Sequence, residues 1–352
     1  KGDLYVEIDN ISFFKDDEYT GSFLKGYTLP GFWLQAKGVY YPLDILKLEA
    51  GVHFLRFWGA DHYPNMAYMD IAEWKGDAFH KGVHVLPWLR AQVALSKHVD
   101  IVLGGLYGGA NHNLIEPLYN PELNMIADPE MGLQFLYHSS FLDLDAWVNW
   151  ESFIFRQDVH KEAFTVGLST RFKWNNPESS FHFYTPFQVL AQHRGGEIDT
   201  IMTHSVQTLM NGTVGLGTVW NTGYKVFKSL NLEVDALGYY QQAGKLWPFD
   251  RGWGWYTKVG ADFKHLFVQA GAFGCNQFIS LLGSPYMGAV STRHEGGYYE
   301  GNPFTGFVTV EYSRTYAQLY SFGLKGDIYY SKPGNLTHSD ESARKEKTQG
   351  TG

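Results

Sequence analysis

The feature that most constrains this chain is an alternation of apolar and polar residues with a period of two. In residues 142–151 the even positions carry apolar side chains and the odd positions carry mostly polar ones. Because successive side chains of a β-strand point to opposite faces, the segment predicts a strand with one apolar and one mostly polar face. The pattern recurs at 43–54, 164–174, 230–236, 253–263 and 320–330, whereas amphipathic helices are scarce. The sequence therefore predicts an all-β protein.

The connections between the expected strands alternate between short and long. The short ones lie near residues 41–44, 96–98, 139–140, 175–178, 221–223, 264–265 and 315–317. The long ones cover about 15–28, 59–81, 109–127, 155–161, 195–203, 242–252 and 278–302. Outer-membrane barrels have short periplasmic turns and long extracellular loops, whereas a soluble sandwich or propeller has no reason to alternate. We therefore expect a transmembrane up-and-down antiparallel β-barrel over residues 1–332, in the outer membrane of a Gram-negative bacterium.

Composition agrees with a barrel and excludes other classes. The 352 residues include 25 Phe, 23 Tyr and 11 Trp, only 18% are charged, and the formal net charge is -8. A single cysteine, Cys275, excludes a disulfide scaffold, and the acidic balance argues against a nucleic-acid partner. The mean hydropathy of -0.25 does not oppose a membrane location. In a barrel only every second residue of a strand faces lipid, so the apolar signal averages away.

The strand number is constrained by parity. The alternating segments number about fifteen, but bacterial single-chain barrels have even numbers of strands. Either residues 4–14 are not a full wall strand, or residues 278–302 contain one more. We expect fourteen strands, with sixteen as the alternative. Residues 333–352 are polar and charged, which predicts a disordered tail.

Aromatic residues at the ends of the apolar faces predict two lipid-interface girdles. Trp and Tyr gather at membrane–water interfaces, where their rings lie at the level of the lipid headgroups. The expected girdle residues are Trp150, Trp174, Trp220, Trp253, Trp255 and Tyr330. They would contact outer-membrane lipids and lipopolysaccharide.

Charges of both signs on the polar faces predict a lumen that is narrowed by ion pairs. Pairing residues whose numbers sum to about 316 places Asp143 opposite Lys173 and Asp145 opposite Arg171, and the last hairpin places Glu311 near Lys325. Opposite charges across neighbouring strands contribute roughly 0.2–1 kcal/mol per pair. Such pairs also occur in any barrel wall, so both readings stay open.

The long loops contain more apolar and aromatic residues than loops that face only water. They would pack on each other as a lid, or form a docking surface for another protein. The expected partner-binding residues are Leu114, Ile115, Tyr119, Trp247, Phe249, Leu282 and Tyr286.

Two loop clusters contain residues that could carry chemistry. The first, residues 192–199 with His204 beyond, contains His193 beside acidic residues, and such a histidine could serve as a general base. The second, residues 108–117, reads as a tight turn with a weak cation-site pattern at Asn111, Asn113 and Glu116. Neither has the spacing of a known metal motif, so we expect no catalytic residue, metal or cofactor.

Several segments resemble an outer-membrane barrel family of the Bacteroidota. They are FFKDDEYTGSFLKGYTLPGFWLQAKGVYY (13–41), LKLEAGVHF (46–54), YGGANHNLIEPLYNPE (107–122), VLAQHRGGEIDT (189–200) and GYYQQAGKLWPFDRGWG (238–254). The resemblance implies a porin-like barrel of the kind found in multi-protein outer-membrane complexes. It supplies no motif whose chemistry can be carried over.

Three functions remain open from the sequence. The leading expectation is a non-enzymatic subunit of an outer-membrane complex, such as one for outer-membrane protein assembly, whose loops bind surface lipoproteins or another barrel. The second is a porin-like channel for small solutes. The third is a barrel hydrolase that acts on lipid or peptide with His193 or His204 as the base.

Overall fold

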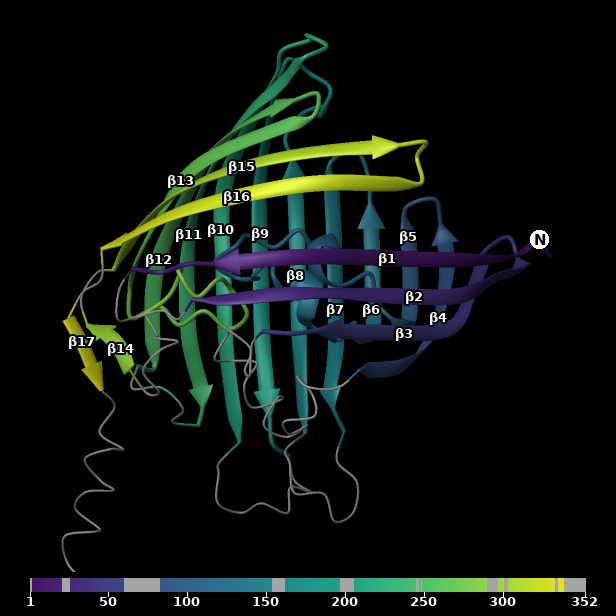
Figure 1. Cartoon of the computed structure of the whole chain (residues 1–352), viewed down its shortest axis with the longest axis horizontal. Coiled ribbons are helices and arrows are strands. Elements are labelled where there is room, and N and C mark those ends of the chain that lie inside the picture. The colour runs from purple at the N-terminus through teal and green to yellow at the C-terminus, as the bar shows by residue number, and fades with distance from the viewer. Residues whose placement is uncertain are drawn as a thin grey trace, which may run out of the picture.

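The computed structural model of the chain describes residues 2–20, 26–59, 83–153, 162–196, 206–244, 247, 249–289, 297–300, 303–332 and 335–338. It is an antiparallel meander in which each strand pairs with its neighbours in chain order (Figure 1). This confirms the all-β fold class. Among the described residues no helix is long and apolar enough to span a membrane, a result that has no bearing on spanning by strands.

Fifteen strands form the main sheet. They are β1 (Leu4–Asp17), β2 (Tyr27–Leu43), β3 (Leu46–Phe57), β4 (His84–Ser96), β5 (Val99–Gly105), β6 (Met131–His138), β7 (Leu142–Ser152), β8 (Ala163–Lys173), β9 (Phe181–Arg194), β10 (Gln207–Asn221), β11 (Phe227–Ala243), β12 (Arg251–Phe263), β13 (Leu266–Asn276), β15 (Phe304–Tyr316) and β16 (Tyr320–Lys332). Two further strands, β14 (Gly297–Glu300) and β17 (Asn335–His338), pair with each other in a small separate sheet.

The count is one more than the fourteen strands that we expected. Strand β1, which the parity argument set aside, pairs with β2 from Leu4 to Asp17. The region 278–302 contributes β14, but to the small sheet. Strand β17 lies in the tail that we expected to be disordered.

The odd number has a geometric consequence. With fifteen antiparallel strands, β1 and β16 point the same way, so joining them would require parallel pairing. No ladder joins them in the part of the chain that the structure describes. The sheet is curled like a barrel, but hydrogen bonds between its edges do not close it.

The two faces of the wall follow the period-two pattern. In β7 the odd positions Asp145, Trp147 and Asn149 are buried and point inward, while the even positions between them point outward. The outward positions of the other strands likewise carry exposed apolar residues such as Val214, Leu216 and Val234. The inward polar face is thus buried, which is the reverse of a soluble sandwich.

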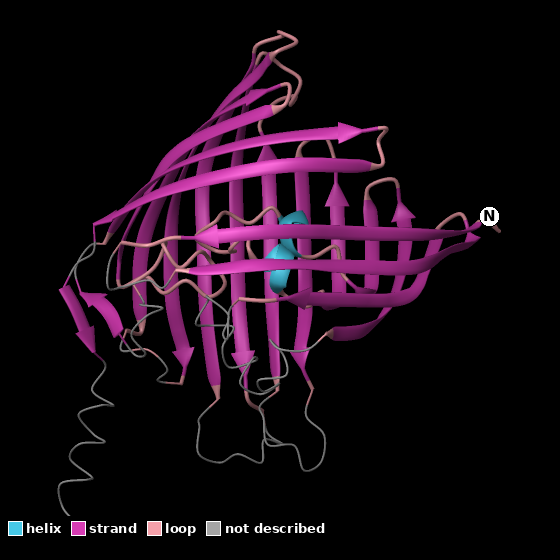
Figure 2. Ribbon diagram, in the orientation of Figure 1, coloured by secondary structure: helices cyan, strands magenta, loops and turns pink. Residues whose placement is uncertain are grey.

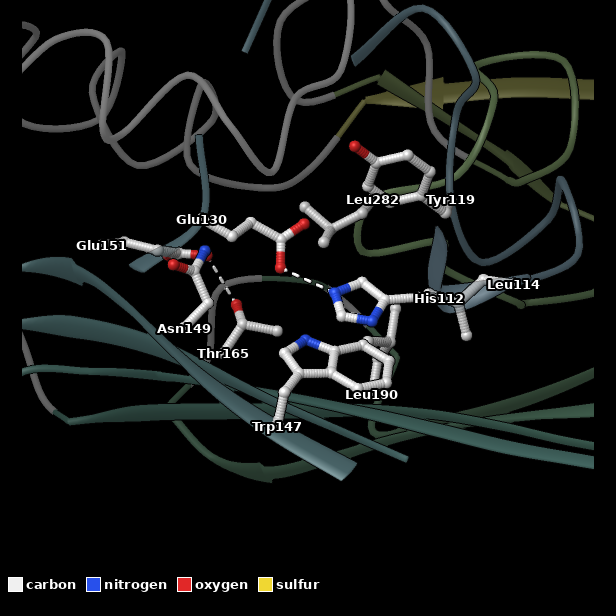
Figure 3. A pocket seen from close by; sticks show the side chains of 10 residues that line it. All are labelled: His112, Leu114, Tyr119, Glu130, Trp147, Asn149, Glu151, Thr165, Leu190 and Leu282. Carbon is white, nitrogen blue, oxygen red and sulfur yellow. Dashed lines mark hydrogen bonds and ion pairs between the residues drawn. The ribbon is translucent and has the colours of Figure 1, made fainter. Parts of the chain in front are cut away.

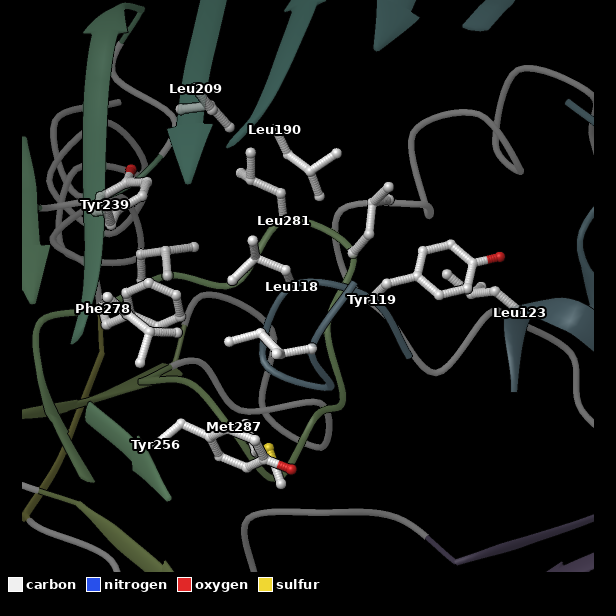
Figure 4. Close-up of a cluster of buried hydrophobic side chains, with 14 of the residues drawn as sticks. Leu118, Tyr119, Leu123, Leu190, Leu209, Tyr239, Tyr256, Phe278, Leu281 and Met287 are labelled. Carbon is white, nitrogen blue, oxygen red and sulfur yellow. The ribbon is translucent and has the colours of Figure 1, made fainter. Parts of the chain in front are cut away.

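The lumen is filled by two long connections that fold back inside the wall. Inner loop 1 (residues 106–130) contains the helical turns η1 (Gly109–His112) and α3 (Leu123–Ile126), drawn in cyan in Figure 2. Inner loop 2 (residues 277–289) runs beside it, joined by a bridge between Tyr119 and Leu282. Buried apolar side chains of both loops pack on one another and on wall residues (Figure 4). A hydrophobic core therefore occupies the space that a porin leaves open.

Two wall amides fix these loops by capping their backbones. Gln188 on β9 accepts a hydrogen bond from the Ile115 N–H at 3.0 Å and donates one to the Asn113 carbonyl at 2.9 Å. Asn211 on β10 donates to the Ile279 carbonyl at 2.8 Å and accepts from the Leu281 N–H at 2.9 Å. Because an unpaired buried amide is costly, each pair ties its loop to one register on the wall.

Inner loop 1 is also bonded to both edges of the sheet. Lys15 on β1 forms an ion pair with Glu122, and the Tyr27 hydroxyl on β2 donates to the same carboxylate at 2.8 Å. At the other edge, the Tyr329 hydroxyl on β16 donates to Glu116 at 2.7 Å. Side chains inside the lumen thus hold both edge strands.

Candidate functional site

The most distinctive polar group in the lumen is His112, at the end of η1. Its Nδ1 lies 2.7 Å from Asp145 Oδ2 on β7, and its Nε2 lies 2.9 Å from Glu130 Oε2 at the end of inner loop 1. The side chain is 1% exposed. Asp145 also accepts a hydrogen bond from Gln134 Nε2 at 2.9 Å, and Glu130 accepts one from the Gly109 N–H at 2.9 Å. The imidazole is therefore held between two carboxylates that are themselves fixed.

The wall provides a flat platform for this histidine. The ring of His112 stacks on the indole of Trp147, with centroids 3.5 Å apart and planes at 8°. Trp147 lies across Gly167, its partner on β8. A Cβ at position 167 would be 2.0 Å from Cζ2 of the indole, so only glycine lets Trp147 lie flat there. The stack keeps water from one face of the imidazole.

The two carboxylates decide the charge of this histidine. Burial alone would lower the pKa of His112, but Glu130 and Asp145 outweigh it and raise the pKa to about 9. Burial would likewise raise the pKa of Glu130, but its ion pair with His112 lowers it. At neutral pH His112 is therefore an imidazolium, held between Asp145 and Glu130.

A small cavity lies beside His112 (Figure 3). Its volume, about 10 Å³ for the centre of a water-sized sphere, is enough for roughly one water molecule. The inner loops contribute His112, Leu114, Tyr119, Glu130 and Leu282 to its lining, and the wall contributes Trp147, Asn149, Glu151, Thr165 and Leu190. Within it the Thr165 hydroxyl donates to Glu151 Oε1 at 2.6 Å. The cavity thus lies between the His112 cluster, with its carboxylates Asp145 and Glu130, and a third carboxylate, Glu151.

The cation-site pattern at Asn111, Asn113 and Glu116 can be compared with the contacts of these residues in the structure. Among the described residues, no group of three or more His, Cys, Asp or Glu side chains is placed to hold a metal ion. The amides of Asn111 and Asn113 donate to backbone carbonyls of their own turn, and Glu116 accepts from Tyr329. These hydrogen bonds thus join the three residues to three different partners.

The β7–β8 register differs from the one that we used to predict the lumen ion pairs. Asp143 lies opposite Arg171 and Asp145 opposite Ser169, so the pairs sum to 314. Lys173 still reaches Asp143, with Nζ 2.7 Å from Oδ1. Asp145 contacts His112 and Gln134, and Arg171 stacks on Tyr184 with its guanidinium 3.5 Å from the ring centroid.

The last hairpin follows the expected register more closely. Glu311 lies opposite Lys325, whose ammonium forms an ion pair with Asp327 at 3.2 Å.

The residues expected to bind a partner line the inside of the molecule. Ile115, Tyr119, Phe249 and Leu282 are buried in the lumen core, and Leu114, Trp247 and Tyr286 pack against it. This is the arrangement in which the loops pack on each other. Association with a lipoprotein or another barrel remains a prediction, and these side chains do not form an exposed surface for it.

The expected girdle residues all lie on outward positions near strand ends. Trp174 and Trp220 lie at the short-turn end of the wall, and Trp150, Trp253, Trp255 and Tyr330 lie toward the long-loop end. The sites thus form two levels along the barrel.

Of the two histidines of the hydrolase hypothesis, His193 lies apart from the lumen cluster. His193 alternates with the buried Gln192 and Arg194 and therefore points outward. There its Nδ1 lies 2.9 Å from the Thr208 hydroxyl, and its ring packs on Phe164 at 4.9 Å. His204 lies outside the described residues.

Sequence reasoning missed His112, Glu130 and Trp147. A signal was present in β7, where Trp147 is the one aromatic residue on an otherwise polar face. An aromatic ring at an inward position indicates a partner inside the lumen. The partner itself comes from a loop some 35 residues earlier in the chain.

Solved structures similar to this chain are outer-membrane barrels. A loop-deletion mutant of OmpT, an outer membrane protein of Vibrio cholerae, matches with 9% identity and a TM-score of 0.51, over 95% of this chain and 96% of that one. Pseudomonas aeruginosa OccK5 (OpdH) matches with 11% identity and a TM-score of 0.48, over 94% and 93%. At such identities the likeness shows the fold alone. The protein is an outer-membrane β-barrel.

The family comparison adds what the fold leaves open. No curated protein matches this chain significantly. A family model described as "Lipid A 3'-O-deacylase-type" matches residues 1–343. The family is named for an enzyme activity, so our expectation of a non-enzymatic barrel was wrong. That expectation rested on the lack of a catalytic motif in the sequence. The histidine and the carboxylates of the lumen come together only in the fold. The chain belongs to the lipid A 3'-O-deacylase-type family.

Proposed function

We propose that this protein is an outer-membrane esterase that removes an ester-linked acyl chain from a lipid A-type glycolipid. The observation that carries the proposal is His112, held between Asp145 and Glu130 beside a cavity for one water molecule. The family supports the reaction class and the substrate class. Ester hydrolysis needs a water nucleophile, a base to take its proton and an acid for the leaving alkoxide, and this cluster supplies all three.

The charge of His112 assigns the roles. With a pKa of about 9 the imidazole is protonated at neutral pH, so it suits the acid and not the base. Asp145 fixes the Nδ1 side, which leaves Nε2 facing Glu130 and the cavity. A positive charge there also stabilises the negative charge that develops on the carbonyl oxygen. Glu130 is then the base.

The reaction balances with these two groups. Water adds to the ester carbonyl and gives one proton to Glu130, and the imidazolium stabilises the tetrahedral oxyanion. The ester C–O bond breaks as His112 donates its Nε2 proton to the alkoxide. The proton on Glu130 then returns to Nε2, 2.9 Å away. The products are a carboxylic acid and an alcohol, and both groups regain their starting charges.

Substrate entry requires the inner loops to move, because the cavity holds only about one water molecule. Five of its lining residues lie on these loops, so a displacement of the loops enlarges the site without opening the wall. The same loops fill the lumen, which argues against a steady solute channel. A complex with surface lipoproteins is compatible with an enzyme and stays a prediction.

The test is direct. Purified protein reconstituted in vesicles that contain lipopolysaccharide should release fatty acid and leave lipid A lighter by one acyl chain, as measured by mass spectrometry. Glu130→Gln should lower the rate about 10²–10⁴-fold, because the amide cannot accept the proton of water.

Glu122→Gln is the matched control. Glu122 is another buried carboxylate of inner loop 1, but it bonds to Lys15 and Tyr27 and does not line the cavity. This variant should keep at least a third of the wild-type rate. Wild-type protein that leaves lipid A intact under all conditions in which the barrel is folded would exclude the proposed function.

A further inference from the structure

The lumen wall next to the cavity carries buried polar side chains without partners. Gln192 on β9 is 2% exposed, and among the described residues neither its Oε1 nor its Nε2 has a hydrogen-bond partner. Ser152, at the end of β7, is 6% exposed, and its hydroxyl likewise has no partner in the part of the chain that the structure describes. Buried polar groups in folded proteins are nearly always paired, so both side chains call for an explanation.

Other buried glutamines of the same wall show what satisfied amides look like. Gln188 holds the backbone of inner loop 1 with both amide atoms. Gln134 bonds to Tyr107 and Asp145, and Gln241 bonds to the backbone of Trp247. Each of these amides secures a loop to the wall. Gln192 is as deeply buried as they are, but its amide secures none of the loop residues that the structure describes.

The position of Gln192 relates it to the candidate site. It lies directly opposite Thr165, which lines the cavity and bonds to Glu151. The next inward residue along β9 is Arg194, a buried cation opposite Ala163, and Ala163 in turn lies opposite Ser152. Gln192 and Ser152 therefore lie nearer the long-loop end of the wall than His112 and Trp147. Long loops are extracellular in such barrels, so these side chains lie between the cavity and the extracellular end of the lumen.

We propose that Gln192 and Ser152 form a subsite for the sugar headgroup of the lipid, and that this subsite holds the glycolipid while its ester lies at His112. The inference rests on the proposed function. A carboxamide offers a donor and an acceptor side by side, which matches the hydroxyl and N-acyl amide groups of an acylated amino sugar. The serine hydroxyl adds one more donor and acceptor.

The kinetic test compares two esterase substrates. Gln192→Leu, alone and with Ser152→Ala, should raise KM for the glycolipid about 10-fold and leave kcat within twofold, because the lost contacts bind ground state and transition state alike. The same variants should hydrolyse a p-nitrophenyl acyl ester, which has no sugar, with unchanged kcat and KM. Their thermal midpoints should not fall, because Gln192→Leu removes a polar group that has no partner.

Gln188→Leu is the matched control for a structural glutamine. It should lower the thermal midpoint and impair both substrates, because it releases inner loop 1. If Gln192→Leu behaves in this way, or leaves the KM for glycolipid unchanged because Gln192 bonds only to water, the subsite is refuted.

A binding measurement separates this proposal from the esterase activity. In detergent solution, saturation-transfer NMR should detect a β-linked N-acetylglucosamine disaccharide on the wild type and a markedly weaker signal on Gln192→Leu. Binding that depends on Gln192 in a protein without esterase activity would uphold the subsite and reject the proposed function. Esterase activity with disaccharide binding that ignores Gln192 would do the opposite.

Discussion

The two faces of strands β7–β10 contain similar residues in opposite settings. On the outward face His193 packs on Phe164 and bonds to the Thr208 hydroxyl, and all three residues belong to neighbouring strands. On the inward face His112 stacks on Trp147, but it arrives from inner loop 1 and is held by two carboxylates. The outward environment is built from the wall alone, whereas the inward one requires a loop to fold back into the lumen.

This difference indicates which face of a barrel wall can hold reactive polar side chains. Lipid cannot hydrogen-bond to polar groups, so the outward face is limited to apolar contacts and a few satisfied hydroxyls. The lumen can bury charges if they are paired, and here the pairing partners come from loop and wall together. A histidine with one hydroxyl neighbour is a structural or interfacial residue, and a histidine between two carboxylates is a candidate for proton transfer.

Replacing each of the two histidines by alanine should reveal the largest difference between the two faces of the wall. His112→Ala should lower deacylation of lipid A about 10²–10⁴-fold, because both the acid and the charge that stabilises the oxyanion are lost. His193→Ala should change the rate less than threefold. Fatty acid release from lipopolysaccharide vesicles measures both, with barrel content matched by circular dichroism. The opposite order would move the active site to the outer surface of the wall.

The wall itself could be predicted from the sequence because its signal is local. The alternation at 142–151 correctly assigned Asp145 to one face and Val148 to the other, and the alternation of short and long connections follows from the hairpins. The prediction of fourteen strands was wrong because it assumed an even number. Strand β1 is a full strand, and the sheet has fifteen. The register at β7–β8 was off by two in its sum, and a bulge between Trp150 and Ser152 accounts for part of that shift.

The site could not be predicted because its contacts are not local. His112 meets Asp145 across 33 positions of the chain, and Gln188 caps Ile115 across 73. The apolar residues of the loops were recognised as unusual, but period-two reasoning cannot tell whether such loops fold inward or outward. That choice depends on whether the lumen offers an apolar core and polar caps, which only the fold as a whole decides.

A second test compares two tryptophans in the wall. Trp147 is 4% exposed and packs against His112, so Trp147→Ala should lower the free energy of unfolding by about 3–5 kcal/mol. Trp253 is 56% exposed at an outward position, and Trp253→Ala should cost less than about 1 kcal/mol in detergent micelles. Urea-induced unfolding followed by intrinsic fluorescence measures both. Equal losses would show that the lumen core contributes no more than the girdle does.

The smallest expected effect is a pH dependence of stability that arises inside the lumen. His112 has a pKa of about 9 in the folded protein, and 6.5 is the usual value for an exposed imidazole. Below pH 6.5 both states bind the proton and the stabilisation is complete; between pH 6.5 and 9 only the folded state binds it, so stability falls as the pH rises. The stability lost between these two pH values is on the order of 3 kcal/mol.

The urea midpoints at pH 6, 7.5 and 9 should therefore decline more steeply for the wild type than for His112→Gln, whereas those of His193→Gln should follow the wild type. Parallel curves for all three proteins would mean that folding does not raise the pKa of His112, and the acid role assigned to it would have to pass to another group.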